Sequence, residues 1–326
     1  MASRLPPMHV LLARPRGYCA GVARAVDALD HAVQVYGAPL YCYHDIVHNE
    51  TVVERFRKRG VTFVSHLDSV PAQALLFLSA HGVAPSLRDQ ARQKNIRLVD
   101  ATCPLVDKVH REAKRFVADG HHVLVLGHRG HDEVQGILGE APHAITVLEV
   151  DEPWHRIQGQ LDQLPERVTR NLAYVTQTTL SVSDTAQIIV SLKQRFPTIV
   201  GPTVSDICYA TQNRQQALLA LLPRVSAVLV LGSKSSSNTQ RLVEIAKGKA
   251  KEVFALDTPR DLALTQLKKH QSIALTAGAS VPEDLVEQTL TLLSKHFTLR
   301  CEDVSMVTES VRFGRPQGLT GTQLAT

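Results

Sequence analysis

The sequence predicts an α/β protein built from three pseudo-repeated α/β units. Short apolar runs alternate with segments whose apolar residues recur at helical spacing, a pattern typical of parallel or mixed sheets with crossover helices. In each third of the chain, a strand and a loop lead to a cysteine that opens a helix. At 326 residues the chain is also too long for one ordinary core and suits units of roughly 100 residues each.

The units are expected to end near residues 100 and 205. The first unit then covers 1–100, the second 101–205 and the third 206–297, while 298–326 form a C-terminal tail that is strand-like or a loose cover. The first strand, Met8–Ala13, is a candidate to join the sheet of another unit. The repetition lies in pattern rather than in identity, as expected of an old triplication around a pseudo-threefold axis.

The clearest copy of the pattern surrounds Cys103, in the stretch Val99-Asp-Ala-Thr-Cys-Pro-Leu-Val106. The apolar run Ile96–Val99 predicts a strand, and apolar residues from Val106 onward recur at helical spacing. Pro104 suits the first helical position, where a missing N–H costs nothing. Cys103 is therefore expected at a helix N-terminus, where the helix dipole favours a thiolate over a thiol.

Cys19 and Cys208 have the same surroundings. A strand at Val10–Ala13 and a loop precede Cys19, a strand at Thr198–Val200 and a loop precede Cys208, and a helix follows each cysteine. We expect the three thiols to share one site. Three thiolates could hold zinc, with a histidine as fourth ligand, or an iron–sulfur cluster with one iron open to substrate. Structural zinc sites use close pairs such as C-x-x-C, and the chain has none.

Composition is that of a soluble globular protein, with 44% hydrophobic and 21% charged residues. The net charge of +5 comes from scattered Lys and Arg, which argues against nucleic-acid binding and suits a small anionic substrate. Met1–Pro7 lacks a signal-peptide core and no stretch suits a membrane span, so we expect a cytoplasmic protein without a membrane partner. Five cysteines in a reducing compartment favour metal binding or catalysis over disulfides. Cys42 and Cys301 are interpreted as small buried hydrophobic residues.

Polar loops follow six further predicted strands, at the strand ends where open α/β sheets bind ligands. These strands are 39–43, 74–78, 122–126, 171–175, 227–231 and 273–275. Their loops offer N–H and O–H donors beside helix N-termini, which suit a phosphate or diphosphate. The donors are His48, His81, His131, Ser236, Asn238 and Ser280. The role of His128, in the same set of loops, stays undecided.

Six motifs together resemble those of the 4-hydroxy-3-methylbut-2-enyl diphosphate (HMBPP) reductases of LytB type. The resemblance covers roughly residues 8–297, with every motif in family order; the tail beyond 297 does not match, and Ser235 stands where the family pattern has asparagine. The motifs are PRGYCAGV at 15–22, SAHGV at 79–83, DATCPLV at 100–106, TQTTLS at 176–181, DICYAT at 206–211 and TAGAS at 276–280.

The resemblance implies a two-electron reductive dehydroxylation of HMBPP to isopentenyl and dimethylallyl diphosphate, the last step of the non-mevalonate (MEP/DXP) isoprenoid pathway. It implies one 4Fe-4S cluster with an open, non-cysteine iron on Cys19, Cys103 and Cys208. Glu133 would be the proton source, and Thr178 would lie near the substrate hydroxyl. The diphosphate would be bound by His48, His81, His131, Ser236, Ser237, Asn238 and Ser280. Ferredoxin or flavodoxin would supply single electrons, because no G-x-G-x-x-G fingerprint for a nicotinamide or flavin is present.

Other interpretations of the same residues stay open. An open iron that only polarises a hydroxyl would make the protein a hydro-lyase, and a zinc or cluster site without turnover would make it a sensor. Glu133 could be no more than the first-turn acid of its helix. Iron and sulfide analysis of protein purified without oxygen separates zinc from a cluster, and electron consumption separates a reductase from a hydro-lyase.

Overall fold

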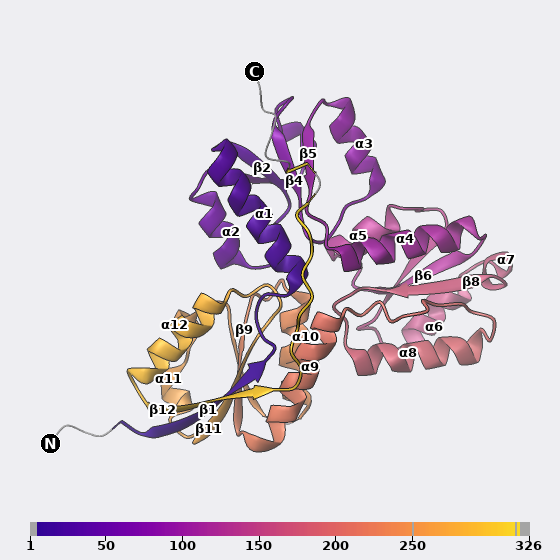
Figure 1. Ribbon diagram of the computed structural model, residues 1–326. Helices are drawn as coiled ribbons and strands as arrows, with labels where there is room; N and C mark the ends of the chain where they lie inside the picture. Colours follow the sequence, from indigo (N-terminus) through magenta and orange to yellow (C-terminus); the bar gives the residue numbers. More distant parts are fainter. Residues whose placement is uncertain (1–4, 250, 317, 320–326) are drawn as a thin grey trace. The chain divides into compact units, whose positions relative to one another are not determined.

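The computed structural model describes residues 5–249, 251–316 and 318–319, which form two compact units (Figure 1). Unit 1 comprises residues 5–23, 47–56 and 209–312, and unit 2 comprises 24–46, 57–208 and the described residues from 313. Among the described residues, unit 1 holds one parallel sheet and unit 2 holds two. The predicted α/β class is confirmed, and the three sheets are all parallel, where the sequence left parallel and mixed sheets open.

The sheet of unit 1 combines the first strand of the chain with strands from its last third. Its strands, in spatial order, are β10 (Glu252–Leu256), β9 (Ala227–Leu231), β11 (Ser272–Ala277), β1 (Pro7–Arg14) and β12 (Thr298–Ser305). Strand β1 pairs in parallel with both β11 and β12, so the first strand and the start of the predicted tail lie side by side (Figure 1, indigo and yellow). Met8–Ala13 thus lies in a sheet with strands from the last third of the chain.

Hydrophobic side chains cover both faces of this sheet, which is why its central strands read as continuous apolar runs. Successive residues of a strand point to opposite faces, so neighbours along the chain enter different cores. One core contains Val10, Leu229 and Leu275, and the other contains Leu11, Val228 and Ala274.

The two sheets of unit 2 are smaller and also parallel. One has the order β3 (Val61–Val64), β2 (Leu40–Tyr43), β4 (Leu75–Leu78), β5 (Arg97–Asp100), and the other has the order β7 (Ile145–Glu149), β6 (His122–Gly127), β8 (Leu172–Thr176). Each strand predicted in these regions before a polar loop is present to within a residue or two.

The predicted strand at Thr198–Val200 is wrong. Only Val200 pairs, as a single parallel bridge to Ala173 beside β8, with its N–H donating to the carbonyl of Leu172 (3.1 Å). Pro202 lacks the N–H that the next ladder bond would need, and on the other side the N–H of Ile199 donates to the carbonyl of Phe196 (3.0 Å) in a turn, so the pairing does not extend.

Helices connect the strands. Those that begin in unit 1 are α1 (Ala20–Tyr36), α2 (Glu50–Arg57), α9 (Tyr209–Leu221), α10 (Ser237–Gly248), α11 (Leu264–Leu267) and α12 (Glu283–Ser294). Those of unit 2 are α3 (Pro85–Gln93), α4 (Pro104–Ala118), α5 (Asp132–Leu138), α6 (Trp154–Asp162), α7 (Glu166–Thr169) and α8 (Val182–Arg195). Short 3₁₀ turns occur at Leu67–Ser69, Leu222–Arg224 and Pro259–Asp261. Within the described part of the chain, no helix combines the length and the apolar character needed to cross a membrane.

Candidate active site

Three cysteines lie directly before helices, as the sequence predicts. Cys103 is the N-cap of α4 with Pro104 at the first helical position, while α1 and α9 begin one residue after Cys19 and Cys208. All three thiols are partly exposed and free of disulfide bonds. A thiol in this position lies near the positive end of a helix dipole, which favours binding of a cation or cluster through sulfur.

The backbone of each of these cysteines is tied to a polar loop at the end of another strand. In every case the cysteine N–H donates to a loop carbonyl. The bonds run from Cys19 to Ala279 (3.2 Å) in unit 1, and from Cys103 to Ala80 (3.0 Å) and Cys208 to Thr178 (3.0 Å) in unit 2. Ala279 directly precedes Ser280, Ala80 directly precedes His81, and Thr178 is itself a predicted substrate contact. Each cysteine is therefore fixed next to a residue predicted to contact substrate.

The other two cysteines differ from this pattern. Cys42 is fully buried in β2, and burial raises the pKa of its thiol well above the usual range, as expected of a small hydrophobic residue. Cys301 is exposed, so the expectation that it is buried is wrong. It lies on β12, an edge strand whose side chains are all partly or fully exposed.

In unit 2, Glu133 and Thr178 form a buried pair. Glu133 lies in the first turn of α5 and is 1% exposed; Thr178 follows β8 and is 4% exposed. The backbone N–H of Thr178 donates to Glu133 Oε1 (2.7 Å), and its hydroxyl donates to Oε2 (2.9 Å). Burial, with a smaller contribution from the charge of Asp206, raises the pKa of Glu133 to about 7 against the opposing effect of the Thr178 hydrogen bonds. This carboxyl can therefore hold a proton near neutral pH.

Two of the predicted histidines lie together in unit 2. The rings of His81 and His131 meet edge to face with centroids 5.6 Å apart. His131 is the N-cap of α5, and its Nδ1 accepts the backbone N–H of Glu133 (3.2 Å). In a neutral imidazole the hydrogen is then on Nε2, which makes that atom a donor. The helix that carries Glu133 thereby orients His131 as well.

Unit 1 gathers Ser236, Asn238, Ser280 and His48. Ser236 is the N-cap of α10, and the Ser280 hydroxyl lies 3.5 Å from its oxygen and donates to the carbonyl of His48 (2.9 Å). Asn238 accepts the N–H of Ala279 (3.0 Å) and donates to the hydroxyl of Thr211 (3.2 Å). Ser236, Asn238 and Ser280 are buried, so this group is a prearranged set of neutral polar side chains at a helix N-terminus.

Ser237, the first residue of α10, is also buried. His128 lies elsewhere in unit 2, with Nδ1 at 3.1 Å from Glu149 and 3.2 Å from Asp151. These two carboxylates account for its position at the end of β6.

Sequence reasoning missed two buried charged residues beside these groups. Asp206 accepts the Thr176 N–H (3.0 Å) and pairs with Lys108 (3.0 Å), and burial raises the pKa of its carboxyl to about 6. Arg214 is fully buried and donates twice to the carbonyl of Gly17, two residues before Cys19. Neither follows a strand directly, so the search for polar strand ends could not find them; Asp206 could have been noticed as a charge inside the DICYAT motif.

Comparison with known proteins decides the family, because the profile of the LytB protein matches residues 10–294. The chain belongs to the LytB family. It is 45% identical over 315 residues to the 4-hydroxy-3-methylbut-2-enyl diphosphate reductase of Rhodopirellula baltica, covering 97% of each chain. It is 46% identical over 316 residues to the protein of the same name from Beijerinckia indica, covering 96% of this chain and 97% of that one.

Two solved structures resemble the LytB chain described here. One is the E-1-hydroxy-2-methyl-but-2-enyl-4-diphosphate reductase of Plasmodium falciparum, with a TM-score of 0.88, 35% identity, and coverage of 95% of this chain and 96% of that chain. The other is a structure of (E)-4-hydroxy-3-methyl-but-2-enyl diphosphate reductase described as the terminal enzyme of the non-mevalonate pathway. It has a TM-score of 0.62 and 26% identity, with 88% of this chain and 99% of that chain covered.

Proposed function

We infer that this protein carries out the reaction named in its relatives. It is a 4-hydroxy-3-methylbut-2-enyl diphosphate reductase, an oxidoreductase that acts in the terminal step of non-mevalonate isoprenoid biosynthesis. The observation that carries this conclusion is the buried Glu133–Thr178 pair, a protonatable carboxyl with a hydroxyl relay. Removal of an allylic hydroxyl as water needs such a proton source.

We propose Cys19, Cys103 and Cys208 as the ligands of one 4Fe-4S cluster with one iron not bound by cysteine. The donor set fits this group, because each thiol is outside any disulfide, partly exposed and placed at a helix N-terminus. Three thiolates satisfy three of four irons. When bound, the cluster supplies a Lewis-acidic iron and a path for single electrons.

The substrate diphosphate is proposed to bind the donors of the strand-end loops. In unit 1 these are His48 and the polar residues at and near the N-terminus of α10; in unit 2 they are the imidazoles of His81 and His131. Hydrogen bonds to a charged group are worth about 1.5–3 kcal/mol each, so several neutral donors can hold a diphosphate without a lysine or arginine in direct contact. The residues at and near the N-terminus of α10 are Ser236, Ser237, Asn238 and, from a neighbouring loop, Ser280.

Glu133 is proposed as the general acid. A protonated Glu133 keeps both contacts to Thr178: Oε1 still accepts the backbone N–H, while Oε2–H donates to the hydroxyl oxygen. The Thr178 hydroxyl then donates its own hydrogen toward the departing substrate oxygen. Proton transfer thus needs only rotation of one hydroxyl.

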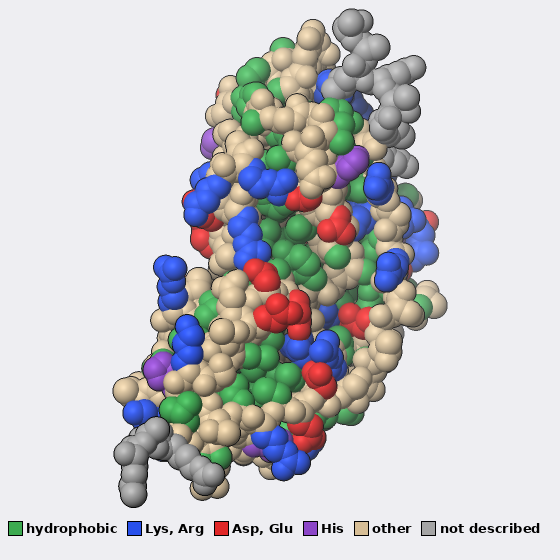
Figure 2. Space-filling model, turned by 60° about the vertical axis from the view of Figure 1, so that its left-hand side comes forward, with side chains coloured by type: hydrophobic (Ala, Val, Ile, Leu, Met, Phe, Trp, Pro, Cys, Tyr) green, Lys and Arg blue, Asp and Glu red, His purple; other side chains and the backbone are tan. Residues whose placement is uncertain are grey.

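The electron donor is proposed to be ferredoxin or flavodoxin. The face in Figure 2 intersperses Lys and Arg with Asp and Glu instead of gathering one sign of charge, so on this face nothing resembles the basic patch of a nucleic-acid-binding protein.

Anaerobic purification tests the proposal. We expect iron and inorganic sulfide in a ratio near one, and turnover of the hydroxylated diphosphate that consumes two electrons for each product molecule. Zinc in place of iron would overturn the cluster assignment. Water loss without electron consumption would make the protein a hydro-lyase.

A further inference from the structure

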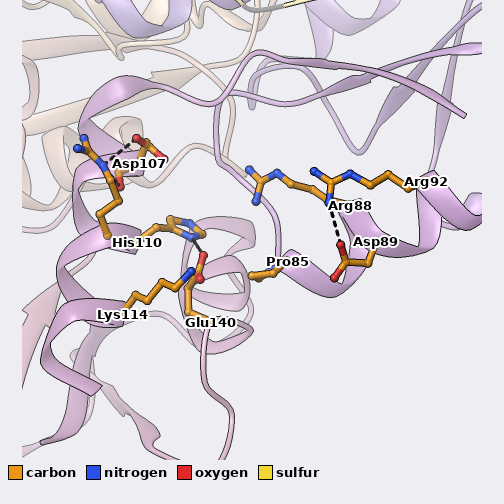
Figure 3. A pocket seen from close by; sticks show the side chains of 9 residues that line it. Pro85, Arg88, Asp89, Arg92, Asp107, His110, Lys114 and Glu140 are labelled. Carbon is orange, nitrogen blue, oxygen red and sulfur yellow. Dashed lines mark hydrogen bonds and ion pairs between the residues drawn. The ribbon is translucent and has the colours of Figure 1, made fainter. Parts of the chain in front are cut away.

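His110 occupies a buried position behind the residues proposed for catalysis. It lies on α4, seven residues after Cys103, and is 5% exposed. Its Nδ1 is 2.8 Å from Oε1 of Glu140, and both side chains are at least nine-tenths buried. The pair lies at the base of a cavity of about 300 Å³ between α3 and α4, where Figure 3 shows the imidazole and the carboxyl turned toward each other. A buried polar pair away from the reacting groups calls for a reason.

The far edge of the imidazole is packed against backbone. A Cβ added at Gly82 would lie 3.0 Å from His110 Nε2, and one added at Gly136 would lie 3.0 Å from Cε1 and 3.1 Å from Nε2. Gly82, with φ of +77°, directly follows His81. Gly136 is one helical turn beyond Glu133 on α5. Only residues without a side chain allow the ring to approach both segments so closely.

The Glu140 contact connects the same ring to α5 a second time. Glu140 follows Gly139, the C-cap of α5, so its carboxyl moves with the helix that carries Glu133. Nε2 of His110 has no hydrogen-bond partner among the described residues, which means that this edge serves packing. The His110 side chain thus contacts the loop of His81 and the helix of Glu133. His110 itself belongs to α4, the helix that Cys103 caps.

We propose that His110 is a positioning residue that sets the spacing between the His81 imidazole and the Glu133 carboxyl. This inference rests on the proposed function, which assigns diphosphate binding to His81 and proton donation to Glu133. Misplacement of reacting groups by about 1 Å can cost on the order of 100-fold in rate. Because the His110 ring packs against both segments, its removal is expected to affect both KM and kcat.

Steady-state kinetics and substrate titration of the anaerobic holoenzyme test the proposal. For His110→Ala we expect kcat to fall about tenfold or more and KM to rise several-fold. Phe116→Leu is the matched control, because Phe116 is buried further along the same helix in the core beneath β6. It is expected to lower Tm comparably and to keep kcat and KM within about twofold of wild type. Equal kinetic losses in both variants would reduce His110 to a structural role.

A double-mutant cycle tests the contact between the His110 ring and Gly136. Gly136→Ala raises helix propensity but places a methyl group against the ring, so kcat should fall in the His110 background. With His110→Asn, whose amide still donates toward Glu140 but is shorter than the ring, Gly136→Ala should change kcat by less than about twofold. Equal losses from Gly136→Ala in both backgrounds would overturn the inference.

The two proposals fail in distinguishable ways. If Glu133→Gln loses turnover while His110→Ala keeps wild-type kcat and KM, only the positioning inference is wrong. If Glu133→Gln keeps turnover, the proton-donor role is wrong, and the KM of His110→Ala compared with that of Phe116→Leu still decides whether His110 positions the His81 loop.

Discussion

Glu133 is held where its charged form is unfavourable at neutral pH. The carboxyl is 1% exposed, and burial raises its pKa from 4.5 to about 7, although two Thr178 donors favour the anion. In the unfolded chain the same group loses its proton near 4.5. Between these values the folded state holds more protons than the unfolded state, so this residue lowers stability as pH rises from about 4.5 to about 7.

Replacing this residue by glutamine should therefore stabilise the protein at neutral pH. Glutamine can accept the Thr178 N–H and donate to its hydroxyl, so the contacts of the protonated acid persist. We expect the free energy of unfolding of Glu133→Gln, relative to wild type, to grow by about 3 kcal/mol between pH 4.5 and 7.5. Urea unfolding at the two pH values measures it. A difference independent of pH would mean that folding leaves the pKa of Glu133 at its unfolded value.

The same variant should be a poor enzyme. Glutamine cannot release a proton, so turnover should fall by roughly 10²–10⁴ while iron content and substrate affinity stay near wild type. Thr178→Val should fall less, because water can replace the hydroxyl as a relay. Anaerobic steady-state assays with iron analysis check both. A first-turn acid without a catalytic role would leave turnover near normal.

The cysteines provide a matched set. Cys19→Ser, Cys103→Ser and Cys208→Ser should each abolish turnover and lower bound iron, because each removes a helix-terminal thiol. Cys42→Ser and Cys301→Ser should keep turnover and cluster. Iron and sulfide content of anaerobic protein, read before any assay, separates loss of ligand from loss of chemistry. Loss of the cluster in Cys42→Ser with retention in Cys208→Ser would refute the ligand assignment.

At the scale of elements, the strand–loop–helix pattern was readable because parallel strands buried on both faces are continuous apolar runs. Val10–Ala13, Ala227–Leu231 and the strand before Cys103 needed no tertiary information. The backbone hydrogen bonds from the three cysteine N–H groups to the carbonyls of other loops could not be predicted, because they depend on which strand ends become neighbours.

The failures have equally local causes. Val200 forms one bridge because a turn precedes it and Pro202 follows it, and Cys301 is exposed because β12 is an edge strand of the sheet that also holds β1. His110 escaped notice because an apolar helix face with one histidine is the normal pattern of a buried helix. Its meaning depends on Gly82 and Gly136, which approach it only in the folded chain.

Asn238 offers a prediction at this scale, because its side chain joins α10 to two other segments. Asn238→Ala leaves the partly buried N–H of Ala279 without its acceptor, a loss of about 1 kcal/mol. Asn238→Asp keeps the acceptor and should restore most of this stability, yet bind the diphosphate poorly because it places an anion near an anion. Urea unfolding and substrate titration separate the two effects; equal stability of both variants would contradict the assignment.

At the scale of the whole chain, the first and the last strand belong to the same sheet. Strands β1 and β12 pair along their full length, and Glu309, in the segment after β12, contacts Arg214 on α9. Arg214, which is fully buried, donates to the carbonyl of Gly17 and pairs with Glu309 (3.1 Å). The tail, which matched no family motif, thus supplies the counter-charge for a cation that holds the loop leading to Cys19.

The last prediction follows from that counter-charge. Glu309→Ala leaves a buried guanidinium without its carboxylate, and breaking a buried pair in this way costs about 3–5 kcal/mol. We expect the variant to unfold at lower urea concentration and to lose iron faster to a chelator, because the loop before Cys19 loosens. Glu302→Ala is the matched control, since it removes a partly exposed carboxylate paired with Arg224 on the same strand-and-tail segment. It should change stability by less than about 1 kcal/mol. Equal iron release from both variants would show that the tail does not support the cysteine loop.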